Sequence, residues 1–334
     1  MPKQIKLKCQ NGLSFKHVVA DVLADLDEFE FIESEHPDFI IFGPYGDDLP
    51  PPGDYVRIGY FCENITPDLD ICEYAFGIPS EREINDPKYK RIQWHGLNPN
   101  SLIKNLSDND IDEIISQKTK FCNFLYSNTV AYREDFFRQL SKYKKIDAPG
   151  RSMNNMPSID TLYQGDIWDR KRAFLKEYKF TIAFENYAYP GYQTEKLYDA
   201  MLVNSLPIYC GDANIQEIFN PKSFLNARDY VAITNNGLIK FLERVSQQDF
   251  TDYRPQFKTS LAQKAIRKFK TMGRAIKMKY EFNHLDFSPL IDRIIEIDRN
   301  EDLYISYLKQ PWFNNNEVSS KLKTRDQWMK IFNS

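Results

Sequence analysis

Residues 180–200 combine a strand, an aromatic loop and a helix start, an arrangement that could bind a ligand at the edge of a sheet. The apolar run Phe-Thr-Ile-Ala-Phe predicts a buried strand that delivers Glu185 and Asn186 to its carboxyl end. A loop rich in Tyr, Gly and Pro follows it. Because doubly wound sheets bind ligands at the carboxyl ends of their strands, these two side chains are candidates for a binding site.

The start of the next helix carries the charge that such a site would use. Thr194 stands where a helix cap belongs, and Glu195 and Lys196 lie in the first turn. A helix N-terminus presents free N–H groups and a partial positive charge, which suit phosphate, and Lys196 adds a full charge. A capped surface helix with a favourable first-turn glutamate would show the same pattern, so these residues alone leave both interpretations open.

The net charge of −3 on the 334 residues is unevenly distributed. Residues 1–100 hold 18 acidic and 9 basic side chains, whereas residues 101–334 hold 29 acidic and 35 basic ones. A basic second half suggests that an anion binds there, although chance could produce the same asymmetry. The charge is too weakly positive for a protein that binds duplex nucleic acid, so we expect no nucleic-acid partner.

Residue spacing does not indicate a metal site. The five Cys include no CxxC pair, and the four His show no HExxH motif. Asp-x-Asp triplets, which can bind a divalent ion, begin at Asp25, Asp68, Asp108 and Asp110. Such triplets are expected by chance in a chain with 47 acidic residues. We therefore expect no metal site and no required cofactor, although a divalent cation could stimulate activity by screening a diphosphate.

The rest of the chain alternates between short apolar runs and amphipathic stretches, the pattern of an α/β protein. We expect strands at 38–43, 55–61, 74–78, 120–126, 146–147, 180–184 and 206–209, and helices at 13–28, 131–142, 195–203, 237–248 and 261–280. A polar stretch, 96–117, contains a short acidic helix and is expected to connect two α/β halves. Two such halves predict two Rossmann-like domains facing a cleft.

The predicted domains are residues 1–117, residues 118–300 and a C-terminal helical segment, 301–334, which we expect to pack back on the N-terminal domain. The end of this segment, 321–332, is mildly amphipathic and basic. It could touch a membrane surface, but we expect its apolar face to pack on the protein. No apolar run has the ~20 residues that span a bilayer, and the N-terminus has no signal-peptide pattern. The expected location is cytoplasmic, at most peripheral to a membrane.

Spaced motifs in the second half resemble those of the α-1,3/4-fucosyltransferases, glycosyltransferase family 10. The specific ones are Phe-Glu-Asn at 184–186, Tyr-Gln-Thr-Glu-Lys at 192–196 and Pro-Ile-Tyr-Cys-Gly at 207–211, with further matches at 142–150, 174–180 and 223–230. The resemblance implies two Rossmann-like domains of the GT-B type. It further implies that 1–117 binds the acceptor and 118–300 binds the GDP-sugar donor.

The resemblance also implies a donor site made of five residues. Arg133 matches the family's diphosphate-binding arginine, and Lys196 matches its phosphate-binding lysine. Glu195 matches the acid that holds the ribose hydroxyls of the nucleotide, and Asn186 and Tyr192 match positions that contact the donor. A forked guanidinium and a point ammonium together suit a diphosphate leaving group.

Glu63, which follows the expected strand 55–61, matches the family's proposed catalytic base, and Glu73 is a nearby second candidate. The implied activity is inverting transfer of L-fucose from GDP-β-L-fucose to a hydroxyl of an oligosaccharide acceptor. The expected linkage is α-1,3 to GlcNAc of an N-acetyllactosamine-type glycan. An inverting transfer uses one carboxylate to take the acceptor proton and positive charge to stabilise the departing diphosphate.

Two features depart from the family pattern. The heptad repeats that bacterial members often carry do not occur in this sequence, and the donor loop Tyr-Ala-Tyr-Pro-Gly at 187–191 defines the sugar less well than the nucleotide. Two alternatives therefore stay open. One is a glycosyltransferase that uses another nucleotide sugar, and the other is a catalytically silent glycan-binding protein on the same fold.

Overall fold

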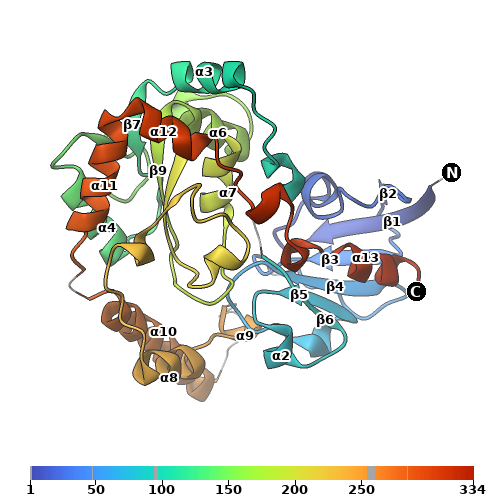
Figure 1. The fold of residues 1–334 in the computed structure, drawn as a ribbon. Helices are drawn as coiled ribbons and strands as arrows, with labels where there is room; N and C mark the ends of the chain where they lie inside the picture. The colour runs from blue at the N-terminus through green and yellow to red at the C-terminus, as the bar shows by residue number, and fades with distance from the viewer. Residues whose placement is uncertain (1, 47, 94–96, 254–259, 284) are drawn as a thin grey trace. The chain divides into compact units, whose positions relative to one another are not determined.

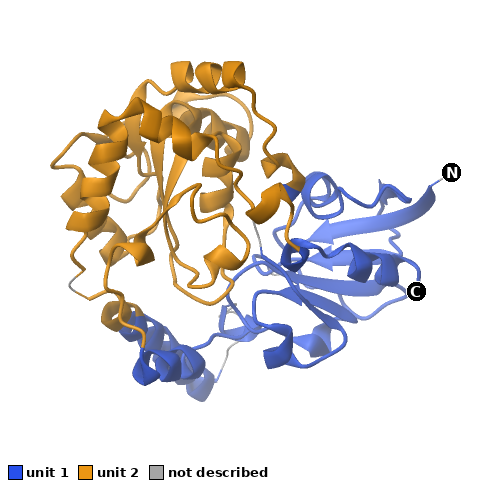
Figure 2. Cartoon of the chain, viewed as in Figure 1, with its two compact units in different colours: residues 1–99, 236–277, 320–334 blue, residues 100–235, 278–319 orange. Residues whose placement is uncertain are grey.

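A computed structural model describes residues 2–46, 48–93, 97–253, 260–283 and 285–334 of the chain. The chain forms two compact units, which Figure 2 shows in different colours. Unit 1 contains residues 1–99, 236–277 and 320–334, and unit 2 contains residues 100–235 and 278–319. Each unit is built around a parallel sheet with helices, so the predicted α/β class with two Rossmann-like units is confirmed.

Unit 1 holds a six-stranded parallel sheet with the order β2-β1-β3-β4-β5-β6. Its strands are β1 (Lys3–Gln10), β2 (Phe29–Glu33), β3 (Phe39–Phe42), β4 (Val56–Phe61), β5 (Tyr74–Gly77) and β6 (Tyr89–Arg91). Apolar runs in the sequence predict β3, β4 and β5, whereas the other three strands are not predicted. In β1, Ile5 and Leu7 are buried between exposed polar residues, an alternation that indicates a half-buried strand but forms no apolar run.

The helices of unit 1 come from three separate stretches of the chain. They are α1 (Phe15–His17), which continues into a π-helical turn at Val18–Val22, α2 (Glu81–Ile84), α8 (Gly237–Val245), α9 (Phe250–Tyr253), α10 (Leu261–Glu281) and α13 (Arg325–Phe332). The first helix is thus shorter than the predicted 13–28, and residues 278–281 of α10 belong to unit 2. Within the described ranges, no helix combines the length and the apolar character that crossing a membrane requires.

The last helix, α13, completes the core of unit 1 (Figure 1). The ring of Trp328 is fully buried and stacks on Phe76 with 4.2 Å between ring centroids. Phe332 is also fully buried and packs edge-on against Phe39, with 5.0 Å between the centroids. The prediction that the apolar face of 321–332 packs on the protein is therefore confirmed.

Unit 2 holds a five-stranded parallel sheet with the order β11-β10-β9-β7-β8. The strands are β7 (Lys120–Asn123), β8 (Ile146–Asp147), β9 (Tyr178–Phe184), β10 (Leu206–Cys210) and β11 (Leu225–Asn226). The helices are α3 (Asp108–Gln117), α4 (Ala131–Leu140), α5 (Ile159–Leu162), α6 (Ile167–Lys176), α7 (Glu195–Leu202), α11 (Ser288–Arg299) and α12 (Glu301–Leu308). β9 and β10 are buried almost throughout, as in a sheet covered on both faces, which explains why their apolar runs predict them. The predicted connector contains α3, and its first residue, 96, lies outside the described residues.

The division into units differs from the predicted domains over 236–277, which belongs to unit 1 rather than to the second half. Thr66 binds this segment on both sides, because its N–H donates to Gln248 O at 2.8 Å and its carbonyl accepts from the Phe250 N–H at 2.9 Å. The Phe250 ring packs on Phe61 with 5.0 Å between centroids. Because these contacts join residues far apart in the chain, no local sequence pattern predicts that 236–277 belongs to unit 1.

The C-terminal helical segment is also divided. Residues 301–319 belong to unit 2, and residues 320–334 belong to unit 1. Lys104 holds the first part, because its Nζ donates to Leu308 O at 2.7 Å and to Gln310 O at 2.9 Å at the end of α12. The same Nζ lies 3.3 Å from the ring centroid of Trp312. Packing back on the N-terminal unit is thus found for the last part of the predicted segment.

Replacing Trp328 with alanine is expected to destabilise unit 1 by about 3–5 kcal/mol, the usual cost of removing a large buried aromatic side chain. Denaturant titrations followed by circular dichroism would measure the change. Lys330→Ala serves as the control, because this neighbouring side chain is exposed and its loss should change stability by less than about 0.5 kcal/mol. Equal stability of the two variants would show that α13 does not contribute to the core.

Candidate functional site

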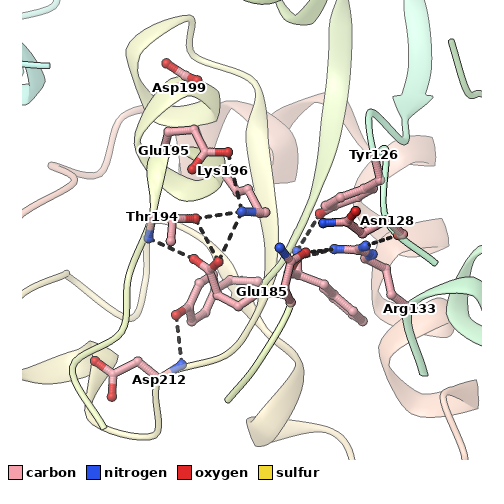
Figure 3. A network of polar contacts seen from close by, with 12 residues as sticks. Tyr126, Asn128, Arg133, Glu185, Thr194, Glu195, Lys196, Asp199 and Asp212 are labelled. Atoms are coloured by element: carbon pink, nitrogen blue, oxygen red, sulfur yellow. Dashed lines mark hydrogen bonds and ion pairs between the residues drawn. The ribbon is translucent and has the colours of Figure 1, made fainter. Parts of the chain in front are cut away.

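The candidate site lies in unit 2 at the carboxyl ends of β7 and β9, which are neighbours in the sheet. From β7 the chain passes through α4 to β8 on one side, whereas β9 begins the series β9, β10, β11 on the other side. The segments that follow β7 and β9 therefore diverge. Such a switch point is where doubly wound sheets bind their ligands. Figure 3 shows the polar side chains that gather there.

Glu185, at the end of β9, is buried at the centre of this group (Figure 3). Its Oε1 accepts a hydrogen bond from the Thr194 N–H at 2.9 Å, and its Oε2 accepts one from the Thr194 hydroxyl at 2.7 Å. The Nζ of Lys196 lies 3.4 Å from the same Oε2. Gly211 leaves room for this carboxylate, since a Cβ at that position would lie 2.6 Å from Glu185 Cγ. Glu185 therefore ties the end of β9 to the start of α7.

Thr194 occupies the N-cap position of α7, as predicted, but its side chain does not cap the helix. The hydroxyl donates to Glu185 instead, and it accepts a hydrogen bond from Lys196 Nζ at 2.9 Å. The start of α4, at Val130, likewise has no side-chain cap among the described residues. Two helix N-termini at this edge of the sheet thus keep their partial positive charge without a capping side chain.

Lys196 and Glu195 are both held in their charged forms. Lys196 Nζ lies 3.4 Å from Glu195 Oε1 and 3.4 Å from Glu185 Oε2. Burial alone would lower the pKa of Lys196, but these two carboxylates raise it above its ordinary value. Burial would raise the pKa of Glu195, yet the charges of Lys196 and Lys171 lower it to about 2. For Glu185, burial raises the pKa, while Lys196 and the Thr194 donors oppose that shift.

Arg133 reaches the site from the first turn of α4, and its side chain is fully buried. Its Nη1 donates to Phe184 O at 3.2 Å and to Asn186 Oδ1 at 2.9 Å, and its Nη2 donates to Asn128 O at 2.5 Å. The guanidinium carbon lies 3.6 Å from the ring centroid of Tyr126. Neutral oxygens and an aromatic face hold this cation, and no carboxylate among the described residues pairs with it. Its Nε is buried with no hydrogen-bond partner among those residues.

Arg133 and Lys196 are close enough for their charges to act on each other. The charge of Arg133 opposes the rise in the pKa of Lys196. Both cations also act on the phenol of Tyr126, whose pKa burial raises and the two charges lower. Two converging cations beside two uncapped helix starts form an arrangement that can bind a polyvalent anion.

A group of ion pairs that was not predicted from the sequence joins Glu195 to α6. Asp199 is buried and pairs with Lys171 Nζ at 2.7 Å and with Arg172 Nε at 3.0 Å. Lys171 Nζ also lies 3.4 Å from Glu195 Oε1. Glu195 and Asp199 stand one helical turn apart, and two acids at that spacing repel each other unless a cation lies between them. That spacing is the signal from which this group could have been predicted.

The structure brings four of the five predicted donor residues into contact with one another or with a shared neighbour. Asn186 is half-buried and accepts from Arg133, and Lys196 pairs with Glu195. The fifth residue, Tyr192, is buried in the loop between β9 and α7, where its N–H donates to Tyr189 O at 3.0 Å. The predicted donor residues therefore lie in one region of unit 2.

Glu63 lies in unit 1, just beyond the carboxyl end of β4, and is half-buried. Its Oε1 accepts a hydrogen bond from the Tyr45 hydroxyl at 2.8 Å. The second candidate, Glu73, is bound to Arg57, with Oε1 2.6 Å from Nη2 and Oε2 3.1 Å from Nε. Partial burial would raise the pKa of Glu73, but the contacts with Arg57 lower it. Glu73 is thus held as the partner of an arginine, whereas the oxygen of Glu63 contacts a phenol.

In the described part of the chain, no group of three or more His, Cys, Asp or Glu side chains is arranged to hold a metal ion. Two of the four histidines, His95 and His284, lie outside the described residues.

Comparison with known proteins bears on the second half of the chain. Residues 115–279 match the family model for the C-terminal part of glycosyltransferase family 10 (fucosyltransferase). The matched stretch contains all five predicted donor residues, while Glu63 lies outside it. The resemblance to this family is therefore confirmed.

Two curated relatives belong to the same class. The chain is 34% identical over 141 residues to a putative fucosyltransferase of Acanthamoeba polyphaga mimivirus, a match that covers 41% of this chain and 23% of the relative. It is 29% identical over 206 residues to an α-(1,3)-fucosyltransferase of Helicobacter pylori, with 52% of this chain and 41% of the relative covered. These matches thus span less than half of each relative's length.

The fold as a whole is similar to a solved structure. A crystal structure of an α1,3-fucosyltransferase with GDP-fucose matches 100% of this chain and 90% of that chain, with a TM-score of 0.59 and 18% identity. Another crystal structure of an α1,3-fucosyltransferase matches with a TM-score of 0.56, also at 18% identity. The chain therefore has the GT-B type of fold that these structures show.

Proposed function

We propose that this chain, which carries a glycosyltransferase family 10 domain, moves L-fucose from GDP-β-L-fucose to a hydroxyl of an acceptor glycan, with inversion. The observation that carries the proposal is the environment of Arg133, a buried guanidinium that lacks a carboxylate partner among the described residues. A buried cation held only by neutral oxygens is costly unless an anion completes its surroundings. The diphosphate of a nucleotide sugar is such an anion.

The donor side of the reaction follows from the two cations. Negative charge grows on the departing diphosphate in the transition state, so positive groups already in place stabilise the transition state more than the ground state. We propose that Lys196 contacts one phosphate and that a diphosphate oxygen replaces Asn186 Oδ1 as the acceptor at Arg133 Nη1. We further propose that Glu195, which its cationic neighbours keep ionised, accepts hydrogen bonds from the ribose hydroxyls. Tyr192 contacts the donor from the same loop.

For the acceptor side we propose Glu63 as the general base. A base takes the proton of the attacking hydroxyl and must present a carboxylate oxygen within about 3 Å of it. Glu63 lies just beyond the carboxyl end of β4 in unit 1, and its Oε1 accepts a hydrogen bond from the Tyr45 phenol. Glu73 is less suited, because its contacts with Arg57 lower its pKa and occupy both oxygens.

The acceptor that we propose is an N-acetyllactosamine-type glycan, with transfer α-1,3 to its GlcNAc. Support comes from the α-(1,3)-fucosyltransferase of Helicobacter pylori among the relatives.

A donor screen that detects released nucleotide, followed by a glycan array, tests both the donor and the acceptor. Turnover with UDP-sugars but not with GDP-fucose would overturn the donor, and nucleotide binding without turnover would favour a silent glycan-binding protein. None of the five cysteines, all of which lie in the described residues, forms a disulfide, and this supports a cytoplasmic location because the cytosol keeps thiols reduced.

Removing Arg133 or Lys196 should weaken GDP binding to the full chain by about 1.5–3 kcal/mol each, since each would lose charge-assisted hydrogen bonds to phosphate. Calorimetric titration of Arg133→Ala and Lys196→Met would measure this. Arg138→Ala is the matched control, because Arg138 lies on the same helix as Arg133 but is exposed and pairs with Glu134. Circular dichroism would show whether each variant folds. Unchanged GDP affinity in both folded variants would remove these residues from the donor site.

Glu63→Gln should leave GDP affinity nearly unchanged and lower turnover about 10²-fold or more, the usual scale for a lost general base. The amide keeps the shape of the side chain and can still accept from Tyr45. Glu73→Gln is the paired variant, and we expect it to retain most of the turnover. Loss of turnover in Glu73→Gln alone would move the assignment to Glu73, and full turnover in both would show that another group takes the proton.

We propose that no metal cofactor is required, because Arg133, Lys196 and the starts of two helices supply the positive charge. Turnover should therefore survive EDTA, measured as release of GDP from GDP-fucose in the presence of acceptor. Added Mg²⁺ could stimulate by screening the diphosphate. Complete loss of turnover in EDTA that Mg²⁺ restores would contradict the proposal and would point to an ion bound with the donor.

A further inference from the structure

Helix α10 exposes an apolar face along most of its length. The side chains of Phe269, Met272 and Tyr280 are each more than half exposed, and that of Ile276 is 36% exposed. Spacings of three and four residues place all four on one side of the helix. Leu261 and Ile266, nearer its N-terminus, are also exposed. No described part of the chain covers this face, and at 21 residues the helix is about 31 Å long.

Ion pairs on the opposite side of α10 hold the helix with this apolar face outward. Lys270 forms ion pairs with Asp249, at 3.1 Å, and with Asp252, and Lys277 lies 3.2 Å from Glu243 of α8. Lys277 is only 1% exposed. The helix thus packs through its charged side, the reverse of an ordinary surface helix, and the opposite side cannot turn inward without breaking these pairs.

The close packing of α10 against the end of α8 also holds α10 in this orientation. A Cβ at Gly273 would lie 2.8 Å from Ser246 Cβ, so the absence of a side chain at Gly273 allows the two segments to pack. α8 itself exposes Leu238 and Phe241, each to about half of its surface. Figure 1 shows the two helices side by side. Both of these neighbouring helices thus expose apolar side chains, a feature that is common at interaction sites.

The exposed charges of α10 are all positive. The helix contains seven basic residues and one acidic residue, Glu281, which is buried and pairs with Arg228 at 2.7 Å. Lys264, Lys268 and Lys279 are exposed. An apolar face bordered by exposed lysines and no exposed acid is complementary to a surface that is negatively charged outside and apolar beneath.

We propose that α10 binds the surface of an anionic lipid bilayer, with its apolar face among the acyl chains and its lysines at the head groups. A second copy of the chain is a poorer occupant, because it would bring the same positive charges and no exposed acid on this helix to balance them. The C-terminal segment 321–332 is not the membrane-binding element, since Trp328 and Phe332 are buried in unit 1. The proposal requires no substrate and is independent of the proposed activity.

Co-sedimentation of the full chain with vesicles tests the proposal. We expect binding to vesicles of phosphatidylcholine mixed with phosphatidylglycerol, little binding to phosphatidylcholine alone, and weaker binding at raised salt. The double variant Phe269→Ser/Met272→Ser should bind about tenfold or more weakly, since burying even one such side chain is worth about that factor. Replacing Lys264 and Lys268 with Gln should reduce the preference for anionic vesicles.

The matched control is Leu162→Ser/Ile167→Ser, which removes two exposed apolar side chains from unit 2 and should leave vesicle binding unchanged. All of the changed side chains are exposed, and circular dichroism would check that each variant folds. Absence of binding to anionic vesicles, or equal binding by the α10 and control variants, would overturn the proposal. So would a dimer in analytical ultracentrifugation that Phe269→Ser/Met272→Ser abolishes without vesicle binding by the native chain, because a second copy would then cover the face.

Discussion

The buried carboxylate of Glu185 is the interaction on which the candidate site depends. Removing a carboxylate from water is costly, and burial accordingly raises its pKa. Two hydrogen bonds from Thr194 and the charge of Lys196 offset that cost. The same contacts fix the start of α7 relative to the end of β9, so the position of Lys196 follows from an interaction made deep in the sheet. Loss of either partner would leave a buried charge uncompensated, which commonly costs several kcal/mol. The geometry of the site is therefore part of the stability of unit 2.

This arrangement leaves one buried cation of the site, Arg133, without a carboxylate partner among the described residues. Glu185 and Glu195 together engage Lys196, and Lys171 and Arg172 are engaged by Asp199. The guanidinium of Arg133 is left with neutral acceptors and an aromatic face. Planar stacking and several weak acceptors can hold an arginine in place without neutralising it. A cation held in this way is preorganised for an incoming anion, because little reorganisation has to accompany the change in charge. In the proposed reaction, these charges would stabilise the departing diphosphate more than they would assist binding of a neutral sugar.

The sequence predicts the strands around the candidate site better than it predicts the rest of the chain. Apolar runs identify β9 and β10 because both are buried on two faces, and the residues that follow them include Glu195 and Lys196. The missed strand β1 alternates Lys with apolar residues, and so has no such run. One feature has no local signal at all: residues 236–277 belong to unit 1 because of contacts with Thr66. The contact of Glu195 with Lys171 joins two helices, and the spacing of Glu195 and Asp199 is its one local signal. In Thr194 the local rule itself fails, since a residue with strong capping preference bonds to a distant carboxylate instead.

Places where the chain departs from local rules coincide with the places where we propose a partner. Thr194 leaves a helix start uncapped, Arg133 is buried without a carboxylate partner among the described residues, and α10 packs through Lys270 and Lys277 while it exposes Phe269. Each departure costs stability in the free protein, whether through exposed apolar surface or through incompletely compensated polar groups. Such losses of stability are typical of binding sites, because the ligand supplies the missing interaction. The proposed ligands differ in kind. An anion would interact with the start of α7 and with Arg133, whereas a bilayer with negative head groups would cover the apolar face of α10. Donor binding and bilayer binding should therefore be separable by substitution, because different side chains are proposed to carry them.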